Sequence, residues 1–516
     1  MAASPHRRLL LVSPRHEYRN LWALKEVAEI MGRKVSTVPL ALPVVAALTP
    51  PSWDVRIVDE EIEDVPLRDR FDLVGITGLS TNIGRGFQIA DTFRAAGIPV
   101  VMGGPYVSTR PDDALRHCDA VVIGEAEEVW APLLADLQAN RLQPRYQADR
   151  LPPGELVPTP RWDLVDTSKV LGLNVQVSRG CPHRCEFCLV HTMYGRRPRY
   201  RPIDAVIDEI RQAPLKNLSF VDDNLTANKP YARELMARIK PLYVQWSGLA
   251  SLEVTRDPDL LRDMAEAGCM SLVLGFESLD PSGLAEAHKS QFRVDEYEAA
   301  VAALHKAGIH CIGAFVLGFD ADTPQSYDRV RDFAARTGIS YLMMNVLTVF
   351  DGTDLERRVS AEGRRIALPP QFLNGVFPTK VSEGMTEREV FDRFIDLMEQ
   401  SYSWAELRHK AHVAFEPGGF NRKAPGSPPL WEKVQATGRL VSSFLFSGDP
   451  DKRGLFLDLV KMSRAGTMPM EFVAHYLLMV EALSSYVGRK LHDRDALWHQ
   501  YESARAAAAQ DVPAVS

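Results

Sequence analysis

Three cysteines within eight residues constrain this chain more than any other feature. They occur in the segment Ser178-Arg179-Gly180-Cys181-Pro182-His183-Arg184-Cys185-Glu186-Phe187-Cys188, with the spacing C-x3-C-x2-C. An apolar run at residues 173–177, typical of a buried strand, directly precedes this segment. Because the chain has six cysteines in all, half of its thiols lie in one loop.

Closely spaced thiolates bind soft metals, which makes an iron–sulfur cluster or zinc the two candidates. A structural zinc site needs four ligands, usually in two separated pairs, and the sequence has no second C-x2-C pair. His183 or His191 could still complete a Cys3His zinc site. A [4Fe-4S] cluster held by only three cysteines leaves one iron without a protein ligand, where a small molecule can bind.

The cysteine segment resembles that of the radical SAM superfamily in three respects. These are the spacing of the cysteines, the aromatic Phe187 directly before the last cysteine, and the position of the segment after the first strand of a β/α repeat. The resemblance implies that Cys181, Cys185 and Cys188 are the catalytic centre and hold a [4Fe-4S] cluster. It also implies that the open iron binds S-adenosylmethionine, with Phe187 among the cofactor contacts. Reductive cleavage then yields a 5′-deoxyadenosyl radical, and an electron donor such as a flavodoxin or ferredoxin is expected as a partner.

Length and composition narrow the class of protein. A chain of 516 residues predicts two or three domains, and 46% hydrophobic with 25% charged residues is typical of a globular protein. The net charge of −7 argues against a nucleic-acid binder. No apolar run reaches membrane-spanning length, and no signal peptide is expected at residues 1–8. The six cysteines show no spacing typical of a disulfide framework, which favours a location in the reducing cytoplasm.

Five short apolar runs in residues 1–140 predict strands that alternate with helices. They occupy residues 8–13, 55–59, 73–78, 99–104 and 120–124. This alternation predicts a parallel sheet covered on both faces, as in a Rossmann-like or flavodoxin-like domain. A nicotinamide cofactor is disfavoured, since no G-x-G-x-x-G follows the first strand.

Gly- and Ser-rich segments follow three of these strands and leave room for a large flat ligand. With Gly103-Gly104-Pro105 and Asp119-Ala-Val-Val-Ile-Gly124-Glu125-Ala-Glu127, the domain resembles the cobalamin-binding domain of B12-dependent radical SAM enzymes. Tyr106 stands where that family often has histidine, and no D-x-H-x-x-G motif occurs, so a histidine ligand to cobalt is not expected. The resemblance implies cobalamin contacts from Ser80, Thr81, Gly103, Gly104, Pro105, Tyr106, Gly124, Glu125 and Glu127.

The chain between residues 141 and 171 is rich in Pro, Arg and Asp and predicts a linker between domains. Six strand candidates follow, at residues 173–177, 218–222, 244–250, 271–276, 309–317 and 341–348. They predict a partial (β/α)6 barrel of TIM type over residues 172–357, with active-site residues at the carboxyl ends of its strands.

Polar residues do follow these strands. The resemblance implies that Asp222 and Asp223 hold the amino group of S-adenosylmethionine, although Asn224 could also serve as a helix N-cap. It implies that Glu277 and Ser278 contact the cofactor's ribose or carboxylate, and that Gly318 lies near its adenine. Two departures from the family pattern stand out: Asp320 occupies a usual proline position, and Val349-Phe350-Asp351-Gly352-Thr353-Asp354-Leu355 replaces a Pro-x-Pro-Gly-Thr-x-Leu turn.

Beyond residue 358 the apolar spacing of three and four residues predicts a mainly helical domain, which we expect to cap the barrel mouth. Helices are expected at residues 387–402, 430–445, 453–462 and 472–490, followed by a frayed tail at 503–510.

The sequence thus predicts an enzyme that methylates an unactivated carbon of a small-molecule or natural-product substrate, using a [4Fe-4S] cluster, S-adenosylmethionine and cobalamin. One alternative keeps these cofactors but catalyses a cyclisation, rearrangement or oxidation without methyl transfer. A second alternative is a cobalamin-loaded sensor with a structural zinc site.

Overall fold

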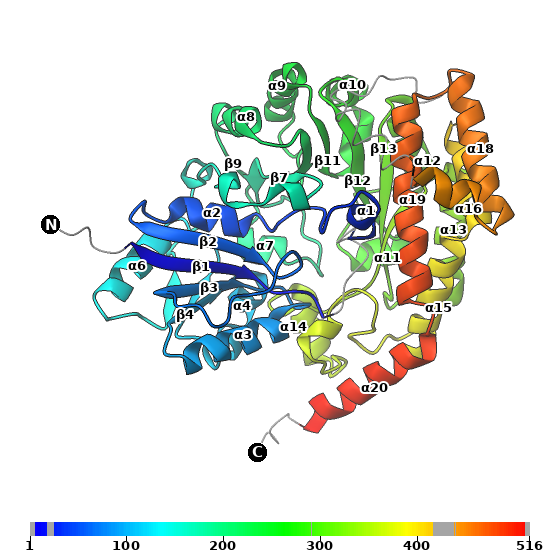
Figure 1. The fold of residues 1–516 in the computed structure, drawn as a ribbon. Coiled ribbons are helices and arrows are strands. Elements are labelled where there is room, and N and C mark those ends of the chain that lie inside the picture. Colours follow the sequence, from blue (N-terminus) through cyan, green and yellow to red (C-terminus); the bar gives the residue numbers. More distant parts are fainter. Residues whose placement is uncertain (1–5, 18–24, 290, 416–437, 439, 511–516) are drawn as a thin grey trace.

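Two parallel six-stranded sheets form the centre of the protein, and helices pack around both (Figure 1). The computed structural model describes residues 6–17, 25–289, 291–415, 438 and 440–510. In Figure 1 the first sheet is drawn in blue and cyan, the second in green, and the C-terminal helices α18 and α19 lie on the far side of the second sheet.

The first sheet has the strand order β2-β1-β3-β4-β5-β6. Its order reverses between β1 and β3, and ligands of such sheets bind beyond the carboxyl ends of the strands at this switch point. Alternate residues of β1 enter different cores, Leu9 and Leu11 on one face and Leu10 and Val12 on the other. The strands are Arg7–Ser13 (β1), Trp53–Asp59 (β2), Leu73–Thr77 (β3), Val100–Gly103 (β4), Ala120–Ile123 (β5) and Arg145–Gln147 (β6).

Both faces of this sheet carry helices, as a parallel sheet requires. Apolar residues of α2 and α6 share one core with Leu9 and Leu11, while those of α3, α4 and α5 share the other. The bounds are Ala41–Leu48 (α2), Ile83–Ala95 (α3), Pro105–Thr109 (α4), Pro111–Leu115 (α5) and Trp130–Gln138 (α6).

Strand β6 lies in the segment that was expected to be a linker, so the first sheet continues past residue 140. It pairs with β5, and only Tyr146 of its three residues is buried. A strand this short and charged has no apolar alternation by which a sequence could reveal it. The chain then runs through short 3₁₀ turns back along the first domain, where Lys34 N–H donates to the Lys169 carbonyl oxygen at 2.8 Å.

The second sheet has the order β14-β13-β12-β11-β10-β7, and every neighbouring pair is parallel. All six expected strands are present, which confirms a parallel β/α sheet. They span Leu173–Val175 (β7), Asn217–Phe220 (β10), Gln245–Ala250 (β11), Cys269–Glu277 (β12), His310–Leu317 (β13) and Tyr341–Val346 (β14). The intervening helices include Ile203–Gln212 (α8), Lys229–Ile239 (α9), Pro258–Glu266 (α10), Tyr297–Lys306 (α12) and Pro324–Thr337 (α13).

The C-terminal region is helical, as expected. Its helices reach both ends of the second sheet, since Val390 of α15 lies beside Gly318 at the carboxyl end of β13, whereas α16 and α19 pack at the amino ends. Ring contacts place Phe415 of α16 6.1 Å from His310 and Tyr476 of α19 5.8 Å from Tyr341, at the amino ends of β13 and β14. The helices are Glu387–Ser401 (α15), Trp404–Phe415 (α16), Pro450–Arg464 (α18), Met470–Lys490 (α19) and Arg494–Gln510 (α20). Of the described helices, none has the length and apolarity that crossing a bilayer requires.

Two expectations for this region need comment. The helix expected at residues 430–445 lies mostly outside the described residues. The expected frayed tail is part of the regular helix α20, because aromatic side chains of that helix have partners in the core: Tyr501 stacks 5.6 Å from Phe377 and Trp498 lies 5.3 Å from Phe391. Apolar packing of these rings holds the helix in place. The Ala-rich sequence of its last turns does not predict this packing.

Gly104 sits at the tight turn between β4 and α4, and we predict that Gly104→Ala destabilises the protein. Its φ is 96°, and an added Cβ would lie 2.7 Å from Thr77 Oγ1. Gly97→Ala is the matched control, because its φ is 76° but nothing lies within 4 Å of the new Cβ. Thermal unfolding should show a melting temperature about 3–6 °C lower for Gly104→Ala than for Gly97→Ala. Equal melting temperatures would contradict the close approach.

Candidate cofactor site

The three clustered cysteines lie in a loop between the short strand β8 (Ser178–Arg179) and helix α7 (Val190–Tyr194). Cys185 is buried and the other two are half-buried, and all three are free thiols. The Cys188 N–H donates to the Cys185 carbonyl oxygen at 3.1 Å, which turns the chain tightly between these two residues. The loop therefore gathers three thiols at the carboxyl end of the first barrel strand.

Burial raises the pKa of all three thiols, to about 11 for Cys185 and about 12 for Cys188. The negative charge of neighbouring thiolates raises the pKa of Cys185 and Cys188 further. Ligation requires the thiolate form, so a metal centre must displace these protons and supply the missing positive charge. Three adjacent thiols of this kind fit an iron–sulfur cluster.

The zinc alternative needs a fourth ligand at the same point. His183 lies 3.3 Å from Gln291, and His191 lies 3.8 Å from a carboxylate oxygen of Asp354. Across the described part of the chain, no three His, Cys, Asp or Glu side chains converge as one metal ion would need. In a [4Fe-4S] cluster each cysteine binds a different iron, so its thiolates do not converge on a single point.

Asp222 and Asp223, expected to hold the amino group of S-adenosylmethionine, accept hydrogen bonds from the chain that leads into the cysteine loop. Asp222 accepts from Ser178 N–H at 2.5 Å, from Ser178 Oγ at 2.7 Å and from Val177 N–H at 3.2 Å. Asp223 accepts from Gly180 N–H at 2.9 Å. Desolvation raises the pKa of Asp222 to about 7 and also raises that of Asp223.

Glu277 and Lys289 form a buried ion pair, with Lys289 Nζ 2.5 Å from Glu277 Oε1. Glu277 ends β12 with a left-handed φ of 62°, where the pairing with β13 shifts register. Burial disfavours a charged lysine, but Glu277 and Cys185 outweigh it and raise the pKa of Lys289 above its ordinary value. No sequence motif marks Lys289. The strained backbone of its partner Glu277, at a strand end, is a feature typical of functional sites.

The other expected contacts of S-adenosylmethionine lie around the same strand ends. Ser278 Oγ accepts from Asp280 N–H at 3.0 Å. Gly318, with a φ of 91°, donates its N–H to Asp322 at 2.7 Å. The ring of Phe187 packs 6.5 Å from that of Phe319, the next residue along. The structure thus brings the cysteine loop against the end of β13.

A cavity with about 1100 Å³ of open space, partly continuous with solvent, separates the strand ends of the first sheet from the barrel. Six of the nine expected cobalamin contacts line it: Gly103, Gly104, Pro105, Gly124, Glu125 and Glu127. The barrel side contributes Gln176, Arg179, Met193, Tyr194 and Val221. No histidine occurs in the lining that the structure describes.

The other three expected contacts, Ser80, Thr81 and Tyr106, are not part of the lining of this cavity. Thr81 Oγ1 is hydrogen-bonded to His16 Nδ1 at 2.8 Å, and Tyr106 OH donates to Asp113 at 3.2 Å. Tyr106 follows Gly104 by two residues on α4, and the turn of that helix carries its side chain to the opposite face.

The two acidic residues in the lining are paired with Arg179, in the cysteine segment, and with Arg199, eleven residues beyond its end. Arg179 Nη1 lies 2.6 Å from Glu125 and 2.8 Å from Glu127, and Arg199 lies 3.0 Å from Glu125. Arg179 and Arg199 are neighbours in the antiparallel pair of β8 with β9 (Arg199–Tyr200). These carboxylates therefore join the first domain to the strand that enters the cysteine loop.

Comparisons with known proteins agree with this geometry. Residues 175–334 match the Radical SAM superfamily. The chain is 32% identical over 330 residues to the Bacteriochlorophyllide d C-12(1)-methyltransferase of Chlorobaculum tepidum, covering 61% of this chain and 72% of that one. It is 30% identical over 382 residues to the Hopanoid C-2 methylase of Rhodopseudomonas palustris, covering 70% and 71%. The chain belongs to the cobalamin-dependent radical SAM enzyme family.

The fold extends the likeness to nearly the whole enzyme. The Cobalamin-dependent S-adenosylmethionine radical enzyme OxsB, solved with aqua-cobalamin and S-adenosylmethionine bound, superposes with a TM-score of 0.61. The match covers 99% of this chain and 84% of that one at 12% identity, so it concerns the fold alone. The family expected from the cysteine loop and the glycine motifs is confirmed by the family match and the sequence relatives.

Replacing Arg179 with methionine should destabilise the enzyme strongly. The side chains of Glu125 and Glu127 are 3% and 1% exposed and would lose a buried counter-ion. Breaking a buried ion pair in this way costs about 3–5 kcal/mol. Arg161→Met is the control, because the Arg161–Asp163 pair is solvent-exposed and such pairs contribute less than about 1 kcal/mol. Similar melting temperatures for the two variants would refute a tight junction.

Proposed function

We propose that this enzyme transfers a methyl group to an unactivated carbon of a small-molecule substrate, using a [4Fe-4S] cluster, S-adenosylmethionine and cobalamin. The observation that carries the proposal is the position of the cavity. One wall is the Gly103-Gly104-Pro105 turn, and the opposite wall includes Met193 and Tyr194, which end the helix that follows the cluster cysteines. Two relatives named as methyltransferase and methylase support the reaction type.

The residues around the cysteine loop fit their proposed roles. Cys181, Cys185 and Cys188 would ligate three irons, and Asp222 and Asp223 hold the backbone that leads into the loop. When bound, the cluster with S-adenosylmethionine supplies a hydrogen-abstracting radical, and cobalamin supplies a transferable methyl group. The Glu277–Lys289 pair, buried beside Cys185, provides polar groups for the amino, carboxylate or ribose groups of the cofactor.

The cavity supports cobalamin binding by its shape and its composition. Glycine backbone at residues 103, 104 and 124 lets a flat ring approach the strand ends closely, and the lining of the first domain is mostly apolar. Leu11, Leu42 and Val44 belong to this lining and would exclude water from a bound ring. A one-electron donor such as a flavodoxin or ferredoxin completes the proposed system.

Replacing Cys185 with alanine should abolish cluster binding and the formation of 5′-deoxyadenosine. The unmodified enzyme, reconstituted anaerobically, should take up about four irons and four sulfides per chain and absorb broadly near ~400 nm. Cys311→Ala is the matched control, because Cys311 is a buried free cysteine within β13. Retained 5′-deoxyadenosine formation in Cys185→Ala would refute the cluster assignment.

The reaction type is tested with S-adenosylmethionine that carries a labelled methyl group. A labelled methyl group in the product supports methyl transfer. Turnover to 5′-deoxyadenosine together with an altered but unmethylated product would favour the alternative, a cyclisation, rearrangement or oxidation. Loss of product in enzyme depleted of cobalamin, with 5′-deoxyadenosine formation retained, would place cobalamin in the methyl-transfer step.

A further inference from the structure

Helix α14 (Asp354–Ala361) contacts the cysteine loop through both main chain and side chain. Leu355 N–H donates to the Glu186 carbonyl oxygen at 3.0 Å. One turn later, Arg358 Nε donates to Glu186 Oε1 at 2.7 Å, and Arg358 Nη2 donates to Glu186 Oε2 at 3.0 Å. Glu186 stands between the last two cluster cysteines, so one helix fixes the backbone and the side chain of that residue.

The guanidinium of Arg358 is itself held by two further carboxylates. Its Nη2 donates to Glu286 at 3.2 Å and its Nη1 donates to Asp320 at 3.4 Å. A bidentate arginine–carboxylate pair has a defined geometry, unlike a contact between point charges. Because Nη1 also binds Asp320 and Nη2 also binds Glu286, the fork that faces Glu186 cannot rotate freely.

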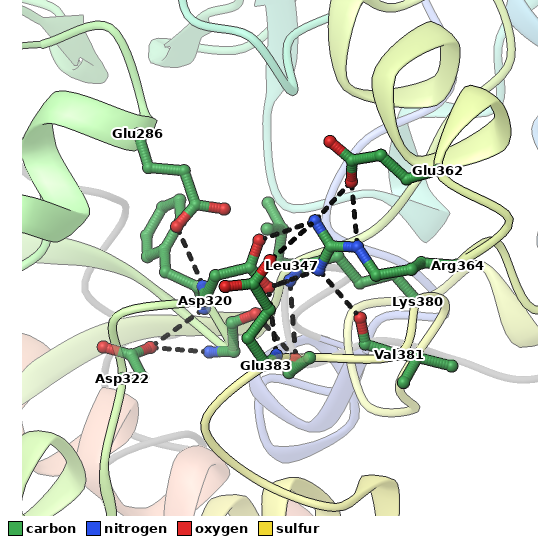
Figure 2. A network of polar contacts seen from close by, with 12 residues as sticks. Glu286, Asp320, Asp322, Leu347, Glu362, Arg364, Lys380, Val381 and Glu383 are labelled. Atoms are coloured by element: carbon green, nitrogen blue, oxygen red, sulfur yellow. Dashed lines mark hydrogen bonds and ion pairs between the residues drawn. The ribbon is translucent and has the colours of Figure 1, made fainter.

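Asp320 is an ionic hub, a carboxylate that accepts from more than one cation. Figure 2 shows Arg364 and Lys380 directed at it, with Arg364 at 2.8 and 2.9 Å from its two oxygens and Lys380 also donating. Its own N–H donates to Glu286 at 2.8 Å. Burial disfavours the charge, but Arg364 and Lys380 hold the pKa of Asp320 well below its ordinary value.

Asp351 is a second hub, in the turn that precedes α14. It accepts from Arg110 of the first domain at 2.5 Å and from Arg365 at 2.6 Å. Beside it, the Gly352 carbonyl oxygen accepts from Thr192 of α7 at 3.0 Å. The start of α14 is thus bound to the first domain and to the helix that follows the cysteines, while its last turns are bound through Arg358 to Asp320.

Both hubs stand where the resembled family has proline. Proline stiffens a turn through its ring, independently of its neighbours. A carboxylate does so only when its cations are in place, and here Arg110, Arg358, Arg364, Arg365 and Lys380 supply them. In this chain the placement of α14 therefore depends on ion pairs.

We propose that Arg358 is a positioning residue for the cluster loop, and that Asp320 and Asp351 hold α14 so that Arg358 can orient Glu186. This inference rests on the cluster site of the proposed function. An ordinary surface ion pair would contribute little to the stability of the loop. Here Glu186 and Lys380 are buried, and the contacts form a connected network.

The test compares Arg358→Met with Arg494→Met in the reconstituted holoenzyme. The side chains of the two arginines are similarly exposed, 29% and 28%, and each pairs with several carboxylates. They differ in location, because Arg494 contacts Asp396 and Glu399 on α15, in the C-terminal helical region. Iron release to a ferrous-iron chelator should be about fivefold faster in Arg358→Met than in the unmodified enzyme. Arg494→Met should release iron at the unmodified rate, and the melting temperatures of both apoproteins report any general loss of stability.

Two further variants distinguish orientation from charge. Arg358→Lys keeps the cation but cannot donate in a bidentate way, so its iron release should fall between those of the unmodified enzyme and Arg358→Met. Asp351→Asn removes one hub without touching Glu186 and should also accelerate release, with an altered EPR spectrum of the reduced cluster. Unmodified release rates and spectra in Arg358→Met would overturn the proposal. An unmodified enzyme that takes up no cluster would instead overturn the proposed function.

Discussion

The buried pairing of Arg179 with Glu125 and Glu127 is the interaction on which the arrangement of the enzyme depends. It joins the strand ends of the first sheet to the strand that enters the cluster loop, across the wall of the cavity. Charges this deeply buried are tolerated only when they are paired, so the two domains must dock for these groups to be stable. The junction therefore fixes the distance between the two proposed cofactor sites, which methyl transfer between them requires.

The cluster loop has few backbone hydrogen bonds of regular secondary structure. Acidic side chains supply hydrogen bonds to it instead. Asp222 and Asp223 bind N–H groups at its entrance, and Glu186 binds α14 from its centre. Buried backbone groups need hydrogen-bond partners, and side chains supply them where sheet and helix do not. Carboxylates from two separate segments, residues 222–223 and the loop itself, thus hold the loop through hydrogen bonds.

The sequence predicts elements well where the signal is local. Each strand of the second sheet buries at least two side chains and is predicted from the sequence, whereas β6 buries only one and is not. The glycine motifs located the cavity, but a motif does not reveal on which face of a short helix Tyr106 points. No motif assigns a role to Lys289 or Arg358, because their partners, Glu277 and Glu186, become neighbours only when distant strand ends and loops meet.

The position of the C-terminal helices changes which residues can discriminate a substrate. Helices α16 and α19 pack against the amino ends of β13 and β14, at the opposite end of the barrel from the cysteines. The segment between α14 and α15 lies at the carboxyl ends instead, where Thr379 Oγ1 donates to Leu347 and Ser382 Oγ donates to Gly318. Reacting atoms must approach within about 3–3.5 Å of each other. Among the described residues, this segment and Val390 of α15, which lies beside Gly318, are therefore at the end of the barrel where the cysteines lie.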